Sequence, residues 1–447
     1  MTLELRDYQN EHLLFHLAHE RSFDALLPGR GKTPIMCVYT QIMFDAYKMK
    51  SVWVMPTALL TKNRDELLKW SGWGEDEVVI LTGPRKKREK FYADSRIKCF
   101  MMSGDMYAKE WRDLPSDVDA VLVDEVTALF GNHTSGRTQS FYISSRRFKR
   151  FLLLSGSPVA GKFSSIYPSL AVIEPRYYVN YNNFIRYHAV FDRFNHICAW
   201  RNGNRIGEIL NRITPSMKDP FEGRKDLKEI IFENCNFDEA QKKAYKELEE
   251  TALLELEDKF IDCRGDNGGG VKAMRCRQLL SCPEALGVDV KENGKDEMLA
   301  IHLTQMKERD EQCVIFSTFI AAQERIKKLC DSLGVRAEIM NGSVSAMERG
   351  RIDKDFREKR LDVIIGSPQV ASLGWNWENA AFCVFYDLPY DNTQFDQSWH
   401  RLSRGTRTKP LLIFILQFNT RVERRIVQIL NRKNKELKSL FDNNVKI

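Results

Sequence analysis

The amino-acid sequence predicts an α/β fold that contains two parallel sheets. Short runs rich in Val, Ile, Leu and Phe recur along the 447 residues, and each is followed by a polar turn and a segment with helical periodicity. Continuous hydrophobicity is typical of parallel strands buried on both faces, and strands that alternate with helices indicate an α/β architecture. The first group of runs lies at 51–56, 120–125 and 151–158, and the second at 313–318, 362–367, 382–387 and 411–417.

The region between the two groups of apolar runs has a different residue pattern. Residues 238–260 place apolar side chains at helical spacing among dense charges, with no strand-like run, and the glycine-rich 264–270 reads as a flexible break. We therefore expect a first lobe at 1–215, a mostly helical insertion or linker at 216–290, and a second lobe at 291–447 that ends in a basic helix.

Composition limits the class of protein. The chain is 43% hydrophobic and 29% charged, contains no run of eighteen apolar residues, and begins without the pattern of a signal peptide. We expect a cytoplasmic protein of a bacterial or phage-infected cell, with no membrane partner. The ten cysteines include no CxxC pair, which argues against a zinc knuckle or a disulfide framework, and the net charge of +7 permits a polyanionic partner.

The stretch "LLPGRGKTP" (26–34) ends like a phosphate-binding loop, although Leu26 stands where such a loop usually opens with glycine. Gly29 and Gly31 allow close backbone approach, Lys32 would reach the terminal phosphates, and Thr33 would place its hydroxyl on Mg²⁺. The loop alone leaves open a chance Gly-Lys-Thr in a basic protein.

An acidic pair about ninety residues later decides between these readings. In "VLVDEVTAL" a buried strand ends in Asp124 and Glu125. Asp124 can enter a Mg²⁺ shell and Glu125 can position or deprotonate the attacking water, which is the arrangement that phosphoryl transfer requires. The combination predicts a nucleotide site for ATP and Mg²⁺.

Further motifs accompany the loop and the acidic pair in a fixed order. They are "LRDYQ" (5–9), "VMPTALLTKNRDELLKW" (54–70), "SGSP" (155–158), "GSPQVASLGWNWENA" (366–380) and "QSWHRLSRGTR" (397–407). Together the seven motifs resemble those of superfamily 2 helicases and, within them, the Swi2/Snf2-like translocases. Two departures stand out: Thr127 follows the acidic pair where the family has histidine, and Arg407 adds a cation after the last motif.

The resemblance implies two RecA-like lobes with ATP between them. Arg404 would serve as the arginine finger by spacing, with Arg401 as the alternative, and Gln9 would read the adenine edge. The implied catalytic residues are Lys32, Asp124, Glu125, Arg401 and Arg404, with Thr33 and Asp124 as the Mg²⁺ ligands. The implied nucleotide contacts are Arg6, Gln9, Gly29, Arg30, Gly31, Lys32, Thr33, Gly374, Asn376 and Gln397.

In the family a DNA strand lies across both lobes and is held by phosphate contacts, so the resemblance implies sequence-independent binding that weakens with salt. By motif position the contacts are Pro56, Thr57, Lys62, Ser103, Gly104, Ser317, Thr318, Gly342, Ser343 and Ser367. Ser155, Gly156 and Ser157 would couple the nucleotide to this track. Short Ser, Thr and Gly turns at strand ends are also what any α/β fold needs.

We expect an ATP-driven DNA translocase or helicase, acting as a monomer, that remodels forked or branched DNA in replication, recombination or repair. The compact motor looks most like small phage-encoded branch-migration helicases, with 216–290 as a candidate strand-separating or duplex-gripping element. The alternatives are a motor subunit of a restriction or defence complex, a pure duplex translocase, an RNA helicase, and a nucleotide-gated DNA-binding scaffold.

Overall fold

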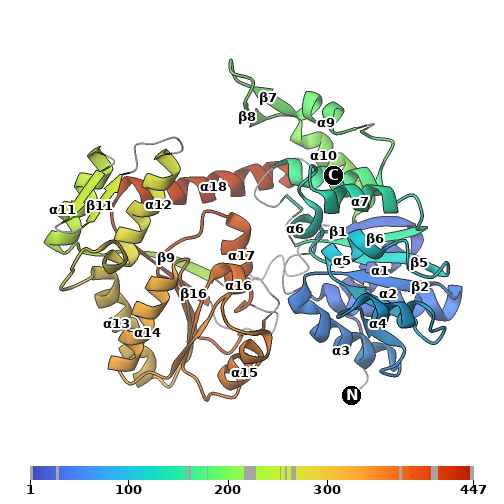
Figure 1. Cartoon of the computed structure of the whole chain (residues 1–447), viewed down its shortest axis with the longest axis horizontal. Coiled ribbons are helices and arrows are strands. Elements are labelled where there is room, and N and C mark those ends of the chain that lie inside the picture. The colour runs from blue at the N-terminus through green and yellow to red at the C-terminus, as the bar shows by residue number, and fades with distance from the viewer. Residues whose placement is uncertain are drawn as a thin grey trace. The chain divides into compact units, whose positions relative to one another are not determined.

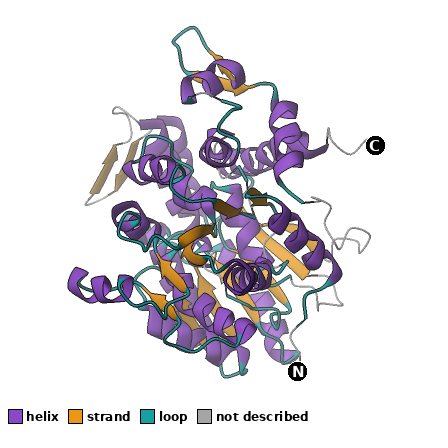
Figure 2. Cartoon of the chain, turned by 90° about the vertical axis from the view of Figure 1, so that its right-hand side faces the viewer, coloured by secondary structure: helices purple, strands orange, loops and turns teal. Residues whose placement is uncertain are grey.

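The chain forms two compact units. The computed structural model describes residues 4–26, 30–156, 158–159, 163–178, 180–215, 228–251, 253–256, 259–262, 268–371, 375–403 and 411–442. Contacts group Met1–Gly223 with Lys435–Ile447 in the first unit and Arg224–Asn434 in the second (Figure 1). Each unit is built on one six-stranded parallel sheet with helices on both faces, which confirms the predicted α/β fold with two parallel-sheet lobes (Figure 2).

The sheet of the first unit has the strand order β1-β6-β5-β2-β4-β3. Its strands are β1 (Arg21–Asp24), β2 (Lys50–Val54), β3 (Val78–Ile80), β4 (Cys99–Met102), β5 (Val118–Val123) and β6 (Arg150–Leu154). The helices are α1 (Asp7–Ala18), α2 (Lys32–Tyr47), α3 (Leu60–Ser71), α4 (Arg85–Tyr92), α5 (Gly104–Glu110), α6 (Val126–Phe130), α7 (Gly136–Ser144), α8 (Tyr167–Ile173), α9 (Tyr181–His188) and α10 (Gly203–Ile213). A small antiparallel hairpin, β7 (Ala189–Phe191) and β8 (Ile197–Trp200), joins α9 to α10.

Alternate side chains of the central strands supply two separate cores. In β5, Ala120 and Leu122 pack with side chains of α1, α2 and α3, whereas Val121 and Val123 pack with side chains of α5 to α10. Both faces of β5 are therefore buried, which explains why its sequence is a continuous apolar run.

The sheet of the second unit has the order β13-β14-β12-β15-β16-β9. Its strands are β9 (Lys228–Asn234), β12 (Cys313–Phe316), β13 (Ala337–Met340), β14 (Val363–Gly366), β15 (Phe382–Phe385) and β16 (Leu411–Gln417). The helices are α11 (Glu239–Thr251), α12 (Gly268–Ser281), α13 (Gly294–Glu308), α14 (Ile320–Ser332), α15 (Ala346–Arg357), α16 (Pro368–Ala371), α17 (Asn392–His400) and α18 (Arg421–Asp442), whose residues from Lys435 on are grouped with the first unit. An antiparallel pair, β10 (Leu253–Leu256) and β11 (Lys259–Asp262), follows α11.

The region expected to be a helical linker differs in two ways. Strand β9 pairs with β16 over its whole length and forms the edge of the second sheet. Its apolar core is only Ile230, Ile231 and Phe232 between charged residues, because an edge strand is half exposed and needs no continuous apolar run. The helix expected through 238–260 ends at Thr251, and β10 and β11 follow. Short apolar runs fit either a helix or a strand, so periodicity could not separate them.

Among the described helices, none combines the length and the apolar character needed to span a bilayer.

Candidate functional site

The predicted residues of the first unit gather at one edge of its sheet. Because the strands are parallel and the pairs Asp24 with Leu154, Val54 with Val123, and Val54 with Met102 are in register, the carboxyl ends of five strands share that edge. The phosphate loop follows β1, Pro56 and Thr57 follow β2, Ser103 and Gly104 follow β4, Asp124 and Glu125 follow β5, and Ser155 and Gly156 follow β6. Ligands of open α/β sheets bind at this edge.

The phosphate loop ends in a glycine that the geometry requires. Gly31 has φ 76° and ψ 46°, and a Cβ atom there would lie 2.4 Å from Nε2 of Gln9. The 16-residue helix α2 begins at Lys32, so the N–H groups of its first turn and its positive end are available to an anion. The ammonium of Lys32 donates to the Leu26 carbonyl over 2.7 Å. Gly29 lies outside the described residues.

Helix α1 holds this loop from the side. The Tyr8 hydroxyl donates to the Arg30 carbonyl over 2.8 Å, and Nε2 of Gln9 donates to the Gly31 carbonyl over 3.0 Å. The side-chain oxygen of Gln9 accepts from the Arg6 backbone N–H over 2.9 Å. Gln9 is buried, so the structure shows it as a brace of the loop, and its contact with adenine stays a prediction.

The acidic pair sits in a sharp turn at the end of β5. Asp124 is buried, its N–H donates to the Val54 carbonyl over 2.9 Å, and its Oδ1 accepts from the Glu125 N–H over 3.0 Å. Glu125 has φ 53° and ψ 46°, a conformation that is uncommon outside glycine and clusters at functional sites. A carboxylate and a hydroxyl are the ligands that Mg²⁺ prefers, so Asp124 and Thr33 fit the role of holding that ion.

Thr127, which stands where Swi2/Snf2-like translocases have histidine, contacts Ser155 within the first unit. Its hydroxyl is 2.5 Å from the Ser155 hydroxyl, and both residues are buried. The Ser155 N–H donates to the Asp24 carbonyl over 3.1 Å. The structure thus links the turn after β5 to the end of β6, where the coupling residues were predicted. Gly156 is buried beside Ser155, and Ser157 lies outside the described residues.

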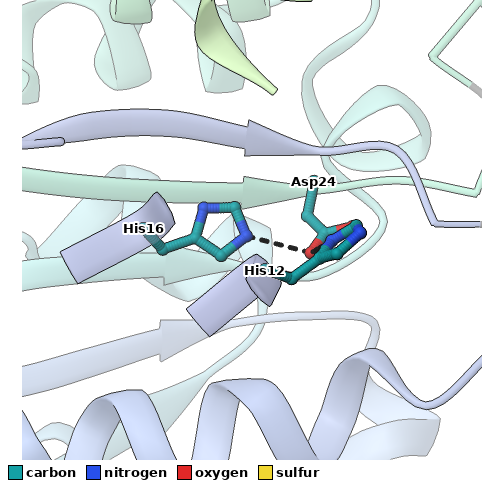
Figure 3. Close-up of side chains that lie close together, drawn as sticks. All are labelled: His12, His16 and Asp24. Atoms are coloured by element: carbon teal, nitrogen blue, oxygen red, sulfur yellow. Dashed lines mark hydrogen bonds and ion pairs between the residues drawn. The ribbon is translucent and has the colours of Figure 1, made fainter. Parts of the chain in front are cut away.

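A buried cluster that the sequence analysis missed lies directly before the loop (Figure 3). Oδ2 of Asp24 is 3.1 Å from Nδ1 of His12 and 2.9 Å from Nε2 of His16. Nδ1 of His16 is 2.9 Å from the Ser22 hydroxyl, and Oδ1 of Asp24 accepts from the Leu26 N–H over 2.8 Å. The spacing of four between the two histidines on α1 was the available sequence signal.

The environment fixes the charges of this cluster. Burial alone would raise the pKa of Asp24, but hydrogen bonds with His12 and His16 outweigh burial and hold that pKa well below its usual range. Burial lowers the pKa of His16 more than its hydrogen bond with Asp24 raises it. Near neutral pH Asp24 is therefore ionised and His16 is neutral. His16 then donates from Nε2 to Asp24 and accepts from Ser22 at Nδ1.

These three side chains are also the group within the described ranges whose ligand atoms lie close enough to share a cation, all within 4.8 Å of one another. The same atoms pair among themselves, and both Asp24 oxygens accept hydrogen bonds. We assign the cluster to positioning, because it ties α1, β1 and Leu26 together and Leu26 in turn accepts from Lys32.

The second unit also has its predicted residues at the carboxyl edge of its sheet, where Phe316, Gly366 and Met340 are in register. Gly342 and Ser343 are exposed after β13, and Ser367 is half-buried after β14. These positions suit contact with a phosphate. The Ser343 hydroxyl donates to Asn341 over 2.6 Å.

Ser317 does not fit the predicted phosphate contact. It is buried, and its hydroxyl donates to Asp387, which also accepts from the Thr318 N–H over 3.0 Å. Arg277 from α12 lies 3.4 Å from the same carboxylate. Ser317 therefore positions the turn after β12. The Thr318 hydroxyl also donates to Asp387 and accepts from Arg277 over 3.2 Å, so a phosphate contact by the half-buried Thr318 stays a prediction.

The last two motifs meet in the second unit. The Trp377 N–H donates to the Arg401 carbonyl over 3.0 Å, which brings the segment containing Asn376 to the end of α17. Gln397 and Arg401 are buried on α17 and at its end, and Asn376 is half-buried. Gly374 and Arg404 lie outside the described residues.

Comparison with known proteins identifies this second unit. Residues 294–409 match the family of the helicase conserved C-terminal domain. The chain is related to ATP-dependent helicases. It is 20% identical to the uncharacterized ATP-dependent helicase MG018 of Mycoplasma genitalium over 97% of this chain and 42% of the relative. It is 21% identical to chromodomain-helicase-DNA-binding protein 1-like of Danio rerio over 87% of this chain and 39% of the relative.

The fold is shared with a solved structure. The structure of Dbp5 from S. cerevisiae, bound to RNA and ADP BeF3, gives a TM-score of 0.57 at 11% identity and covers 97% of this chain and 93% of that one. The chain spans less than half the length of the two curated relatives. The predicted relationship to helicases is confirmed.

The buried cluster predicts a specific pH dependence of stability. Because the pKa of His16 is lowered in the folded protein, the unfolded chain binds more protons once the pH falls below about 6.5. We expect the free energy of unfolding to fall from that point, with a slope of at most about 1.4 kcal/mol per pH unit from this proton. The pKa of Asp24 is also lowered in the folded protein, so this carboxylate acts in the same direction, but only nearer pH 4.

Thermal unfolding between pH 7.5 and 5.5 measures this effect. The variant His16→Gln cannot take up the proton, so its unfolding temperature should depend less on pH than that of the natural protein. His196→Gln is the control, since the side chain of His196 is 80% exposed. Equal pH dependence in the natural protein and in His16→Gln would contradict the assigned charges.

Proposed function

We propose that this chain is an ATP-dependent DNA translocase or helicase of the Swi2/Snf2 type. The observation that carries the proposal is the gathering of a phosphate loop and an acidic pair at one sheet edge, in a chain whose residues 294–409 match a helicase domain. The names of the relatives support ATP dependence, and one of them includes DNA binding.

The residues of the first unit divide the work on ATP. Lys32 and the N–H groups at the start of α2 bind the terminal phosphates, and Thr33 and Asp124 would hold Mg²⁺. That ion supplies charge neutralisation at the phosphate oxygens. Glu125 orients the attacking water and receives its proton. Gln9 and Tyr8 keep the loop in the shape that fits the phosphates.

The second unit supplies the arginine side chains. Arg404, with Arg401 as the alternative, stabilises the charge that develops on the transferred phosphoryl group. Because this contact comes from the second unit, hydrolysis can be coupled to movement between the units.

The edges of both sheets contact the DNA backbone. Backbone N–H groups, hydroxyls and the exposed Lys62 bind phosphates, which carry no sequence information. Binding is therefore independent of sequence and weakens as salt rises. The preferred DNA is forked or branched, and the protein acts as a monomer.

Lys32→Ala tests the ATPase. Removal of an ammonium that stabilises the transferring phosphoryl group should lower duplex-stimulated ATP hydrolysis by about 100-fold or more. Lys109→Ala, an exposed lysine on α5, should leave the rate unchanged. Hydrolysis that survives in Lys32→Ala, or that RNA stimulates more than duplex DNA, would contradict the proposal.

Arg404→Ala tests the assignment of the finger. Turnover should fall by roughly 10³-fold while a fluorescent nucleotide still binds, because the arginine acts in the transition state. Arg421→Ala supplies an exposed arginine of the second unit as a control. If Arg401→Ala loses turnover and Arg404→Ala does not, the arginine finger is Arg401. Unchanged turnover in both variants would show that neither arginine is the finger.

A synthetic four-way junction tests the preferred DNA. We expect ATP-dependent conversion of the junction and of a fork, followed by gel electrophoresis, and no change in a blunt duplex. Hydrolysis stimulated by duplex DNA together with inactivity on forks and junctions would instead indicate a pure duplex translocase.

A further inference from the structure

The hairpin of β7 and β8 lies outside every motif considered so far. It joins α9 to α10 in the first unit and extends away from the helices that cover the sheet of that unit (Figure 1). Among the described strands, β7 and β8 pair only with each other. An isolated two-stranded hairpin is only marginally stable, so large apolar side chains exposed on it call for an explanation.

The hairpin exposes several large apolar side chains together. Phe194 at the turn is 65% exposed, Phe191 and Ile197 are each 43% exposed, and Tyr187 on α9 is 47% exposed. Phe191 and Ile197 are cross-strand partners, so they lie on the same face. Single exposed apolar residues are ordinary on a protein surface, but a group on one projecting element marks an interaction site.

The turn holds Phe194 in place. Oδ1 of Asp192 accepts from the N–H groups of Phe194 and His196 over 2.8 and 2.9 Å. Asn195 has φ 62°, a conformation that asparagine tolerates better than most residues. The one carboxylate of the hairpin therefore serves the turn, and the ring of Phe194 is presented from a fixed backbone.

The base of the hairpin is anchored in an aromatic cluster. Trp200 stacks on Phe163 with ring centroids 4.9 Å apart, and the Arg201 N–H donates to the His188 carbonyl over 2.8 Å. His188 is buried, and its Nε2 contacts the Tyr178 hydroxyl. The exposed end is thus carried on a packed support.

The charge of the segment selects the kind of partner. Between residues 181 and 205 the chain has four arginines, Arg186, Arg193, Arg201 and Arg205, and one acid, Asp192. All four arginines are exposed. The Arg193 guanidinium lies 4.8 Å from the centroid of the Phe194 ring, so a cation and an aromatic face are offered side by side. Aromatic rings beside arginines are the means by which proteins bind unpaired nucleic-acid strands, through base stacking and phosphate contacts.

We propose that this hairpin binds the unpaired bases of a DNA fork, with Phe194 and Phe191 stacking on bases and Arg193 and Arg186 contacting phosphates. The proposal rests on the proposed function for its choice of DNA. It gives the strand-separating role to 189–200, in place of the region 216–290 named from the sequence.

The test measures binding of a fork that carries 2-aminopurine in one unpaired arm, without nucleotide. Phe194→Ala should weaken binding to the unpaired arm by about 5-fold to about 100-fold, because one stacked base is lost. Phe194→Trp should keep the affinity and the quenching of 2-aminopurine. Phe194→Leu keeps an apolar side chain without a ring and should resemble Phe194→Ala.

Tyr47→Ala is the matched control, because Tyr47 is an aromatic residue of the same unit that is 53% exposed and lies near Arg150. Its binding should equal that of the natural protein. Affinity in Phe194→Leu equal to that of the natural protein would overturn the stacking contact. Self-association, or binding to anionic vesicles, would also overturn it if the natural protein and Phe194→Leu show it and Phe194→Ala does not. ATP hydrolysis on a blunt duplex, measured in parallel, should be unchanged in Phe194→Ala, so loss of the hairpin contact and failure of the motor are separated.

Discussion

The candidate nucleotide site of the first unit depends on one buried carboxylate. Asp24 ends strand β1 and accepts hydrogen bonds from helix α1 on one side and from the chain that enters the phosphate loop on the other. An ionised carboxylate in the interior is tolerated only when its partners satisfy it, so the positions of α1 and of the loop are fixed together. Tyr8 and Gln9 extend this control from α1 to the far end of the loop.

The second unit uses a comparable device. Asp387 lies just past the end of β15 and fixes the turn after β12 through Ser317 and Thr318, with Arg277 as its cation. In both units a buried aspartate at the carboxyl edge of the sheet holds a neighbouring turn that was predicted to contact a ligand. Buried hydrogen bonds thus fix the backbone at the edge of each sheet, and the exposed groups project from that fixed backbone.

The sequence predicted those features that leave a local signal. The central strands are continuous apolar runs because both faces are buried, and the phosphate loop and acidic pair keep recognisable spacing. The His12, His16 and Asp24 cluster was missed because its members meet only after α1 packs on β1. The burial of Ser317 was missed because Asp387, its partner, is 70 residues away. The hairpin at 189–200 was missed because its apolar residues look like those of any short strand until their exposure is known.

Strand β9 has a practical consequence for dissecting the protein. It closes the edge of β16 with a full set of main-chain pairs, and along it the exposed Glu229 stands beside the exposed Ile230 and Phe232. Charges of this kind discourage sheets from joining edge to edge. A recombinant second lobe that started at residue 291 would lack β9 and leave the edge of β16 unpaired. Copies of that fragment could then associate through β16. A fragment that starts ahead of Lys228 retains its own closure.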